Sequence, residues 1–185
     1  MIDKIPPEDI IAIVQAAVHD VFSTMLSLPL DDLPAFQETE SDPSESINGV
    51  EALVGIAGSW NGTGRICCTS QFALRMAGAL LMSEYDALNE DVLDAVAEVA
   101  NMVIGNVKTN FEERLGPLGL SVPTVIFGRN YRTRSAGVPS WTVVPFSSAG
   151  EKWEVRFCLM PARTPAHAPQ APHVPSPQID LVPSS

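Results

Sequence analysis

Apolar and polar positions repeat with a helical period in three parts of the chain. The first follows Pro6 and Pro7, which suit the first turn of a helix, and its apolar residues recur every three or four positions as far as Leu26. A shorter periodic segment covers 73–82. The longest covers 88–115, where Asn-Glu-Asp opens the pattern and Gly-Pro follows it. We therefore expect three helices.

Apolar runs bounded by turn residues predict strands. Residues 50–60 and 65–72 flank Asn-Gly-Thr-Gly at 61–64, a strong turn signal, so we expect a β-hairpin there. Three further strands are expected at 122–127, 141–146 and 153–160. The order αββααβββ predicts an α/β fold of the α+β type, with a mixed sheet and long helices packed on it.

Two segments show neither the helical nor the strand pattern of apolar residues. Residues 31–48 are rich in Asp, Glu, Ser and Pro, and we expect an exposed acidic loop. Residues 161–185 contain seven prolines and few large apolar groups, which is typical of a disordered tail. The tail is interpreted as a linker, with a polyproline ligand for a partner as the alternative. One domain over 1–160, followed by this tail, is the expected organisation.

Charge and composition exclude several classes of partner. A formal net charge of −11 repels phosphate backbones and anionic lipid surfaces, so nucleic acid and membrane are not expected as partners. The apolar stretches fall short of the roughly 18 residues that cross a bilayer. No basic, cleavable leader opens the sequence, and the three cysteines suggest no disulfide framework. We expect a cytoplasmic protein with reduced thiols.

The helix predicted over 88–115 has a polar stripe opposite its apolar face. Spacings of three and four residues return a side chain to the same side of a helix. Every amphipathic helix has such a face, but Asn is a poor helix former, and glycine costs about 1 kcal/mol relative to alanine. A site that admits another molecule would explain both. The stripe consists of Asp94, Glu98, Asn101, Gly105, Lys108 and Glu112.

Within this stripe, Glu98 and Asn101 are the candidate catalytic pair, and Asp94, Gly105 and Lys108 are candidate partner-binding residues. A carboxylate beside a carboxamide is neither a nucleophile–base pair nor a metal cage. The amide can hold a water in line with a phosphorus atom, and the carboxylate can bind a cation on a partner protein. A divalent metal site at Asp94 and Glu98 is a minor alternative.

At these residues the sequence resembles the CheX/CheC family of chemotaxis phosphatases, over most of 1–160. The resemblance rests on Asp94-Ala-Val-Ala-Glu98-Val-Ala-Asn101 with a downstream Pro123. It is supported by Val-Phe-Ser-Thr-Met-Leu at 21–26 and by the segment 58–82.

This resemblance implies an enzyme that dephosphorylates the phosphoaspartate of a CheY-like response regulator. Asn101 would orient the attacking water, and Glu98 would pair with the receiver's active-site lysine. The protein would need no cofactor of its own, because Mg²⁺ would sit on the receiver. It also implies homodimers and one active face per chain, since the first helix has no Glu-x-x-Asn. The alternative is a non-catalytic module that binds a receiver or mediates dimerisation.

Overall fold

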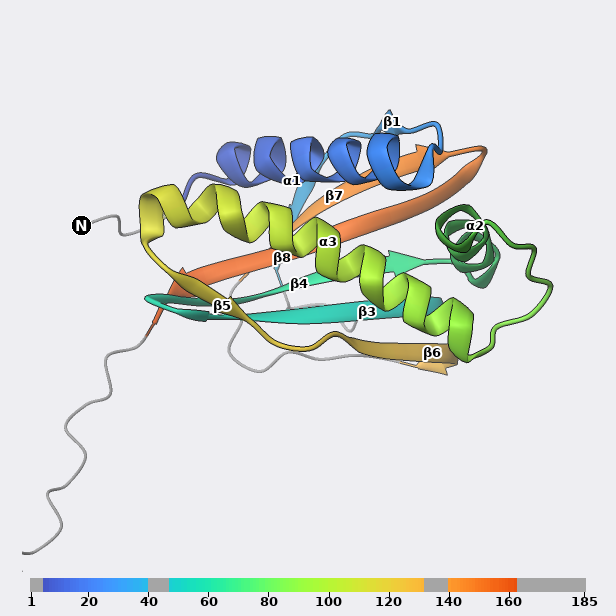
Figure 1. Cartoon of the computed structure of the whole chain (residues 1–185). Helices are drawn as coiled ribbons and strands as arrows, with labels where there is room; N and C mark the ends of the chain where they lie inside the picture. Colours follow the sequence, from blue (N-terminus) through green and yellow to red (C-terminus); the bar gives the residue numbers. More distant parts are fainter. Residues whose placement is uncertain (1–4, 40–46, 132–139, 163–185) are drawn as a thin grey trace, which may run out of the picture.

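The computed structural model describes residues 5–39, 47–131 and 140–162 of the chain (Figure 1). All three predicted helices are present, and α2 starts three residues before the predicted first residue, Ala73. The first helix ends in a π-helical turn, η1. The helices are α1(Pro7–Val21), η1(Phe22–Leu26), α2(Ser70–Leu81) and α3(Glu90–Leu115).

The strands form one 8-stranded sheet in the order β1-β7-β8-β4-β3-β5, with β2 also pairing with β7 and β6 with β3. Every pairing between described strands is antiparallel, so the α+β class is confirmed, with an antiparallel rather than a mixed sheet. The helices lie together on one face of this sheet (Figure 1). The strands are β1(Asp31–Asp32), β2(Phe36–Glu38), β3(Ile47–Gly58), β4(Trp60–Cys68), β5(Leu118–Leu120), β6(Thr124–Tyr131), β7(Trp141–Ser148) and β8(Glu151–Pro161).

The chain repeats one arrangement of elements. A long helix, two short or edge strands and a long hairpin occur first as α1, β1, β2, β3 and β4, and again as α3, β5, β6, β7 and β8. The halves are interleaved, because β1 and β2 pair with β7 while β5 and β6 pair with β3. The hairpins meet at the central β4–β8 pairing. Helix α2 lies between the halves in the sequence.

The predicted turn at 61–64 is wrong. The chain reverses between Gly58 and β4, and Gly62 and Gly64 lie inside the strand, paired on both sides. These glycines mark close approaches instead. A Cβ at Gly62 would overlap the backbone of β8, and a Cβ at Gly64 would overlap the Cδ1 atom of Ile104 on α3. Glycine in a strand is also typical of such close contacts.

The prediction of a plain loop over 31–48 is also wrong in part. Asp31–Asp32 and Phe36–Glu38 form β1 and β2 at the edge beside β7, while 40–46 lie outside the described residues. Strand β5 was likewise not predicted. Segments of two or three residues carry no periodic signal, and their pairing partners are far away in the sequence. The tail predicted from 161 begins at the last residue of β8, and beyond 162 it lies outside the described residues.

An aromatic cluster joins the helices to the sheet. The Trp153 ring on β8 stacks on Phe22 of η1 at 4.8 Å between centroids and on Phe146 of β7 at 4.9 Å. Phe72 of α2 completes the group at 5.6 Å from the same indole. Stacked aromatic pairs contribute about 0.5–1.5 kcal/mol beyond their buried area, so this cluster fixes the position of η1 and α2.

The segment Pro7–Leu26 is long and apolar enough, at a mean hydropathy of 1.4, to cross a bilayer by length and composition, although none was expected. The core helix of a soluble protein passes the same test. Here Val14, Val18 and Val21 are buried in the same core as the sheet residues, and α1 packs on α3 and β7. Its hydrophobicity is therefore used within the fold.

Helix α3 packs closely on the centre of the sheet, where Ile104 occupies the space left by the missing side chain of Gly64. A Cβ there would lie 2.8 Å from Ile104 Cγ1 as well as overlapping Cδ1. Ile104, Val103 and Val107 are completely buried. Because a β-branched side chain adapts poorly at χ1, this contact determines how near α3 lies to β4.

Gly64→Ala is expected to lower the free energy of unfolding by about 1–3 kcal/mol, because the added methyl group overpacks against Ile104. Urea unfolding measures the change. Gly119→Ala on β5 is the control, since its Cβ would lie at an ordinary 3.6 Å from the Ala57 carbonyl oxygen. Equal losses of stability in the two variants would contradict the close packing at Gly64.

Candidate functional site

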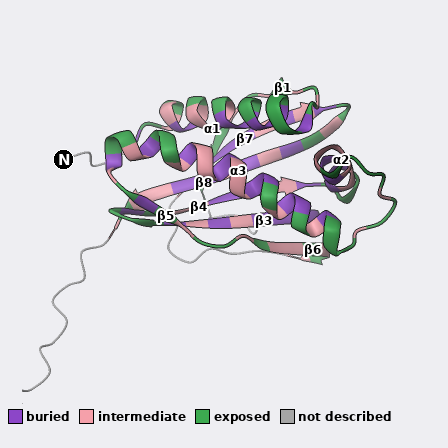
Figure 2. Ribbon diagram, viewed as in Figure 1, coloured by how far each residue is buried: buried purple, intermediate pink, exposed green. Residues whose placement is uncertain are grey.

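Helix α3 supplies the candidate site and is well capped at its start. The Asn89 side chain accepts a hydrogen bond of 2.9 Å from the Val92 backbone N–H, and the acidic Glu90 and Asp91 lie in the first turn, where the helix dipole favours negative charge. The inner face is the predicted one, and its residues are completely buried (Figure 2): Val92, Val96, Val99, Ala100, Val103, Val107 and Phe111.

The predicted polar stripe faces solvent. Asp94 and Glu98 are exposed, while Asn101, Gly105 and Lys108 are partly exposed. Glu98 and Asn101 make no hydrogen bond or ion pair with any described residue. With respect to the described residues, the polar atoms of both side chains are therefore free for a partner.

Other amides on α3 are used within the chain. Asn106 Nδ2 donates to Asp20 Oδ2 of α1 at 3.0 Å, and Asn110 Nδ2 donates to the Asn106 carbonyl oxygen at 2.8 Å. Asn101 differs from both because its amide makes no such bond with any residue that the structure describes. A mid-helix asparagine that costs helix propensity, and makes no hydrogen bond within the described part of the chain, is explained best by an external ligand.

Glu98 and Asn101 are held on a rigid support. Side chains three positions apart on a helix have Cβ atoms about 5–6 Å apart, so one ligand can contact both. Their neighbours Val99, Ala100 and Val103 are completely buried and fix the backbone against the sheet. Little conformational freedom is then lost when a partner binds, apart from that of the two side chains themselves.

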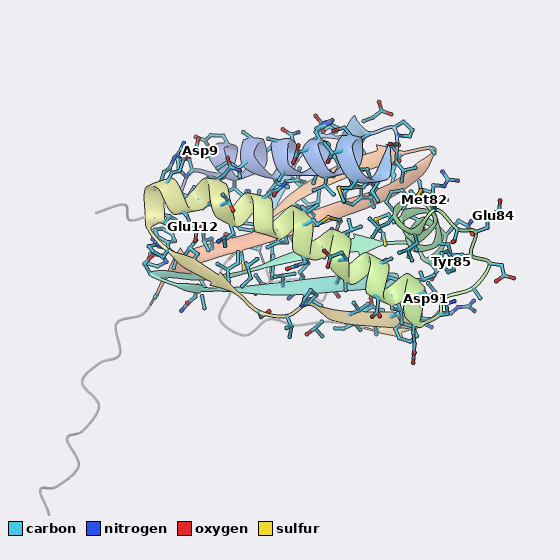
Figure 3. The ribbon with its side chains drawn as sticks, in the orientation of Figure 1. Asp9, Met82, Glu84, Tyr85, Asp91 and Glu112 are labelled. Atoms are coloured by element: carbon cyan, nitrogen blue, oxygen red, sulfur yellow. The ribbon has the colours of Figure 1, made fainter. Side chains whose placement is uncertain are left out.

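Lys108, a candidate partner-binding residue, is engaged within the chain. Its Nζ atom lies 2.8 Å from Glu112 Oε2. Glu112 Oε1 also accepts a 2.9 Å hydrogen bond from the Leu118 backbone N–H, and this bond, with Lys108, lowers the pKa of the Glu112 carboxyl. Glu112 and Asp91 mark the two ends of α3 (Figure 3). The contact joins the C-terminal end of the helix to β5.

The connection between β5 and β6 flanks α3 and was not recognised from the sequence. It is fixed to β3 by two hydrogen bonds of 2.9 Å, from Ser121 N–H to the Gly55 carbonyl and from Gly55 N–H to Ser121 Oγ. Strand β6 starts after Pro123, two residues later than predicted. The proline was the available signal, because it cannot donate to a ladder and favours the position before or at a strand start.

The described residues give little support to a thiol or metal site. Burial raises the pKa of Cys68 to about 12 and also raises that of Cys67, which keeps both thiols protonated. Among the residues that the structure describes, no three His, Cys, Asp or Glu side chains are placed to hold a metal ion. The alternative of a metal at Asp94 and Glu98 therefore has no third ligand among them.

The chain matches known proteins in sequence and in fold. The family described as "Chemotaxis phosphatase CheX" matches residues 50–147, which include Glu98 and Asn101. The CheY-P phosphatase CheX of Thermotoga maritima is 27% identical over 132 residues, covering 68% of this chain and 82% of that protein.

Solved structures of CheX proteins have a similar fold. The chemotaxis protein CheX of Desulfovibrio desulfuricans is 26% identical with a TM-score of 0.71, over 82% of this chain and 99% of that one. The CheX–CheY–BeF₃–Mg²⁺ complex of Borrelia burgdorferi matches with 26% identity and a TM-score of 0.65, over 85% of this chain and 99% of that chain.

Gly105→Ala is expected to raise the free energy of unfolding by up to about 1 kcal/mol, because alanine is the better helix former. The added Cβ would meet Leu120 Cδ1 at 3.9 Å, an ordinary contact. Urea unfolding tests this. A destabilised variant would mean that glycine is needed for packing inside the chain, and not for access to the stripe.

Proposed function

This chain belongs to the CheX family of chemotaxis phosphatases, and on that premise we propose that it accelerates hydrolysis of the phosphoaspartate of a CheY-like receiver domain. One observation carries the proposal: Glu98 and Asn101 project from the solvent-facing side of a buried helix, and neither has a polar partner among the described residues. The reaction class is hydrolysis of an acyl phosphate carried by another protein.

Asn101 would position the water. A carboxamide both donates and accepts hydrogen bonds, so it can hold a water molecule in line with the phosphorus–oxygen bond that breaks. The water attacks phosphorus, the receiver carboxylate leaves, and inorganic phosphate is released. The catalytic gain comes from orientation, since Asn101 itself supplies no nucleophile and no strong base.

Glu98 would fix the register of the two proteins. Its carboxylate, one turn before Asn101, can accept a charge-assisted hydrogen bond from a lysine beside the receiver's phosphorylation site. Asp94 and Gly105 would line the same contact, and Lys108 could join it only by sharing or leaving Glu112. The ion that neutralises the phosphoryl charge, Mg²⁺, would belong to the receiver, so no cofactor of this chain is required.

Two-component signalling in the cytoplasm is the proposed setting, and a homodimer is the proposed assembly. The described sheet has two edges, one formed by β1 and β2 and the other by β5 and β6. Edge strands present unpaired backbone groups that a second copy can use. Light scattering on the purified full chain is expected to give twice the monomer mass, and a monomer at micromolar concentration would contradict the dimer.

Asn101→Ala is expected to slow the accelerated hydrolysis by about 100-fold or more, because the variant loses the group that orients the water. The measurement is the decay of a phosphorylated receiver with and without the protein. The unfolding midpoint should stay close to that of the wild type, since no hydrogen bond to a described residue is lost.

The matched control is Asn110→Ala, which removes the same side chain from an exposed position of the same helix. It should retain the wild-type rate. Full activity in Asn101→Ala would contradict the proposed mechanism. Binding of receivers by the wild type with no acceleration of hydrolysis would instead identify a non-catalytic binding module.

A further inference from the structure

Val122 is exposed to an extent that the fold does not explain. Among the exposed large apolar residues of the described chain, Val122 at 84% relative exposure comes second to Met82 at 92%, while Phe127 is at 55% and Phe36 at 48%. Single apolar residues on a surface are ordinary, so exposure alone carries no argument. The position of Val122 relative to α3 does.

Two contacts place β5, which leads into the β5–β6 connection, alongside α3. Leu118 N–H bonds to Glu112, and the Leu120 side chain lies next to Gly105, so the extended chain runs antiparallel to the helix. Two more extended residues advance about 6.6 Å, which corresponds to roughly four helix residues at 1.5 Å each. Extended in this direction, the chain brings Val122 toward the turns of α3 that carry Glu98 and Asn101, and both β5 and β6 contact α3.

The connection holds Val122 rigidly. Ser121 makes both backbone and side-chain hydrogen bonds to Gly55 on β3, and its hydroxyl also donates to the Val122 carbonyl oxygen at 2.9 Å. Pro123 follows directly and restricts the backbone of Val122 to extended conformations. An exposed apolar side chain thus projects from a backbone that is fixed to β3.

We propose that Val122 is a specificity-determining contact that packs against an apolar side chain next to the receiver's phosphorylation site. This inference rests on the proposed function of Glu98 and Asn101. Burying Val122 against the receiver favours association and excludes bulk water from the flank of Asn101. The charged and amide groups then act in a drier environment, where their interactions are stronger.

The test compares Val122→Asp and Val122→Ala with the wild type in receiver dephosphorylation. Val122→Asp is expected to raise KM for the phosphorylated receiver about tenfold or more, and Val122→Ala by a few-fold, with kcat within about twofold in both. Thermal unfolding should be unchanged, because the side chain is exposed. Phe36→Asp, on β2 at the other edge of the sheet, is the control and should leave KM unchanged.

Calorimetric binding of the receiver separates this inference from the proposed function. A wild type that accelerates hydrolysis, with unchanged KM and affinity in Val122→Asp, overturns the contact alone. If the wild type binds the receiver without turnover and the Val122→Asp variant binds it more weakly, the contact is supported and the catalytic role is overturned. A wild type that neither binds nor acts overturns both. A dimer that becomes a monomer in Val122→Asp overturns the contact by assigning Val122 to a second copy.

Discussion

The close approach of α3 to β4, where Ile104 fills the space above Gly64, is the contact on which the rest of the site depends. A side chain at Gly64 would push the helix away from the sheet. The helix would then lose its register with β5, where Glu112 bonds to Leu118 and Gly105 meets Leu120. Interiors packed as tightly as crystals transmit such displacements instead of absorbing them.

Rigidity suits a protein that works by positioning. The candidate pair is a carboxylate and an amide on a helix whose inner face is completely buried, so its proposed contribution is the placement of these two groups. Placement is useful only if the support does not move. Completely buried residues directly beside Glu98 and Asn101 provide that support, while the labile bond would be brought by the receiver.

The interleaved halves explain why one long helix carries the candidate pair. Helices α1 and α3 occupy corresponding places in the two repeats, yet the sequence of α1 has no Glu-x-x-Asn. Its polar residues serve the fold: Asp20 accepts from Asn106, and Asp9 pairs with Arg114. Helix α1 of the first repeat thus stabilises the position of α3, the helix of the second repeat that exposes the candidate pair to solvent.

The sequence by itself determined the helices, the long strands and the stripe with Glu98 and Asn101, because helical and strand periods are local properties of the chain. The tertiary structure decided the rest. The glycines at 62 and 64 look like a turn until β8 and α3 are seen to approach them, and β1, β2 and β5 are too short to have a period. Val122 was predicted as a strand residue, but it lies before β6, in a connection that Ser121 ties to Gly55 of β3. Each of these depends on contacts between distant segments, and a local pattern of apolar and polar residues does not encode those contacts.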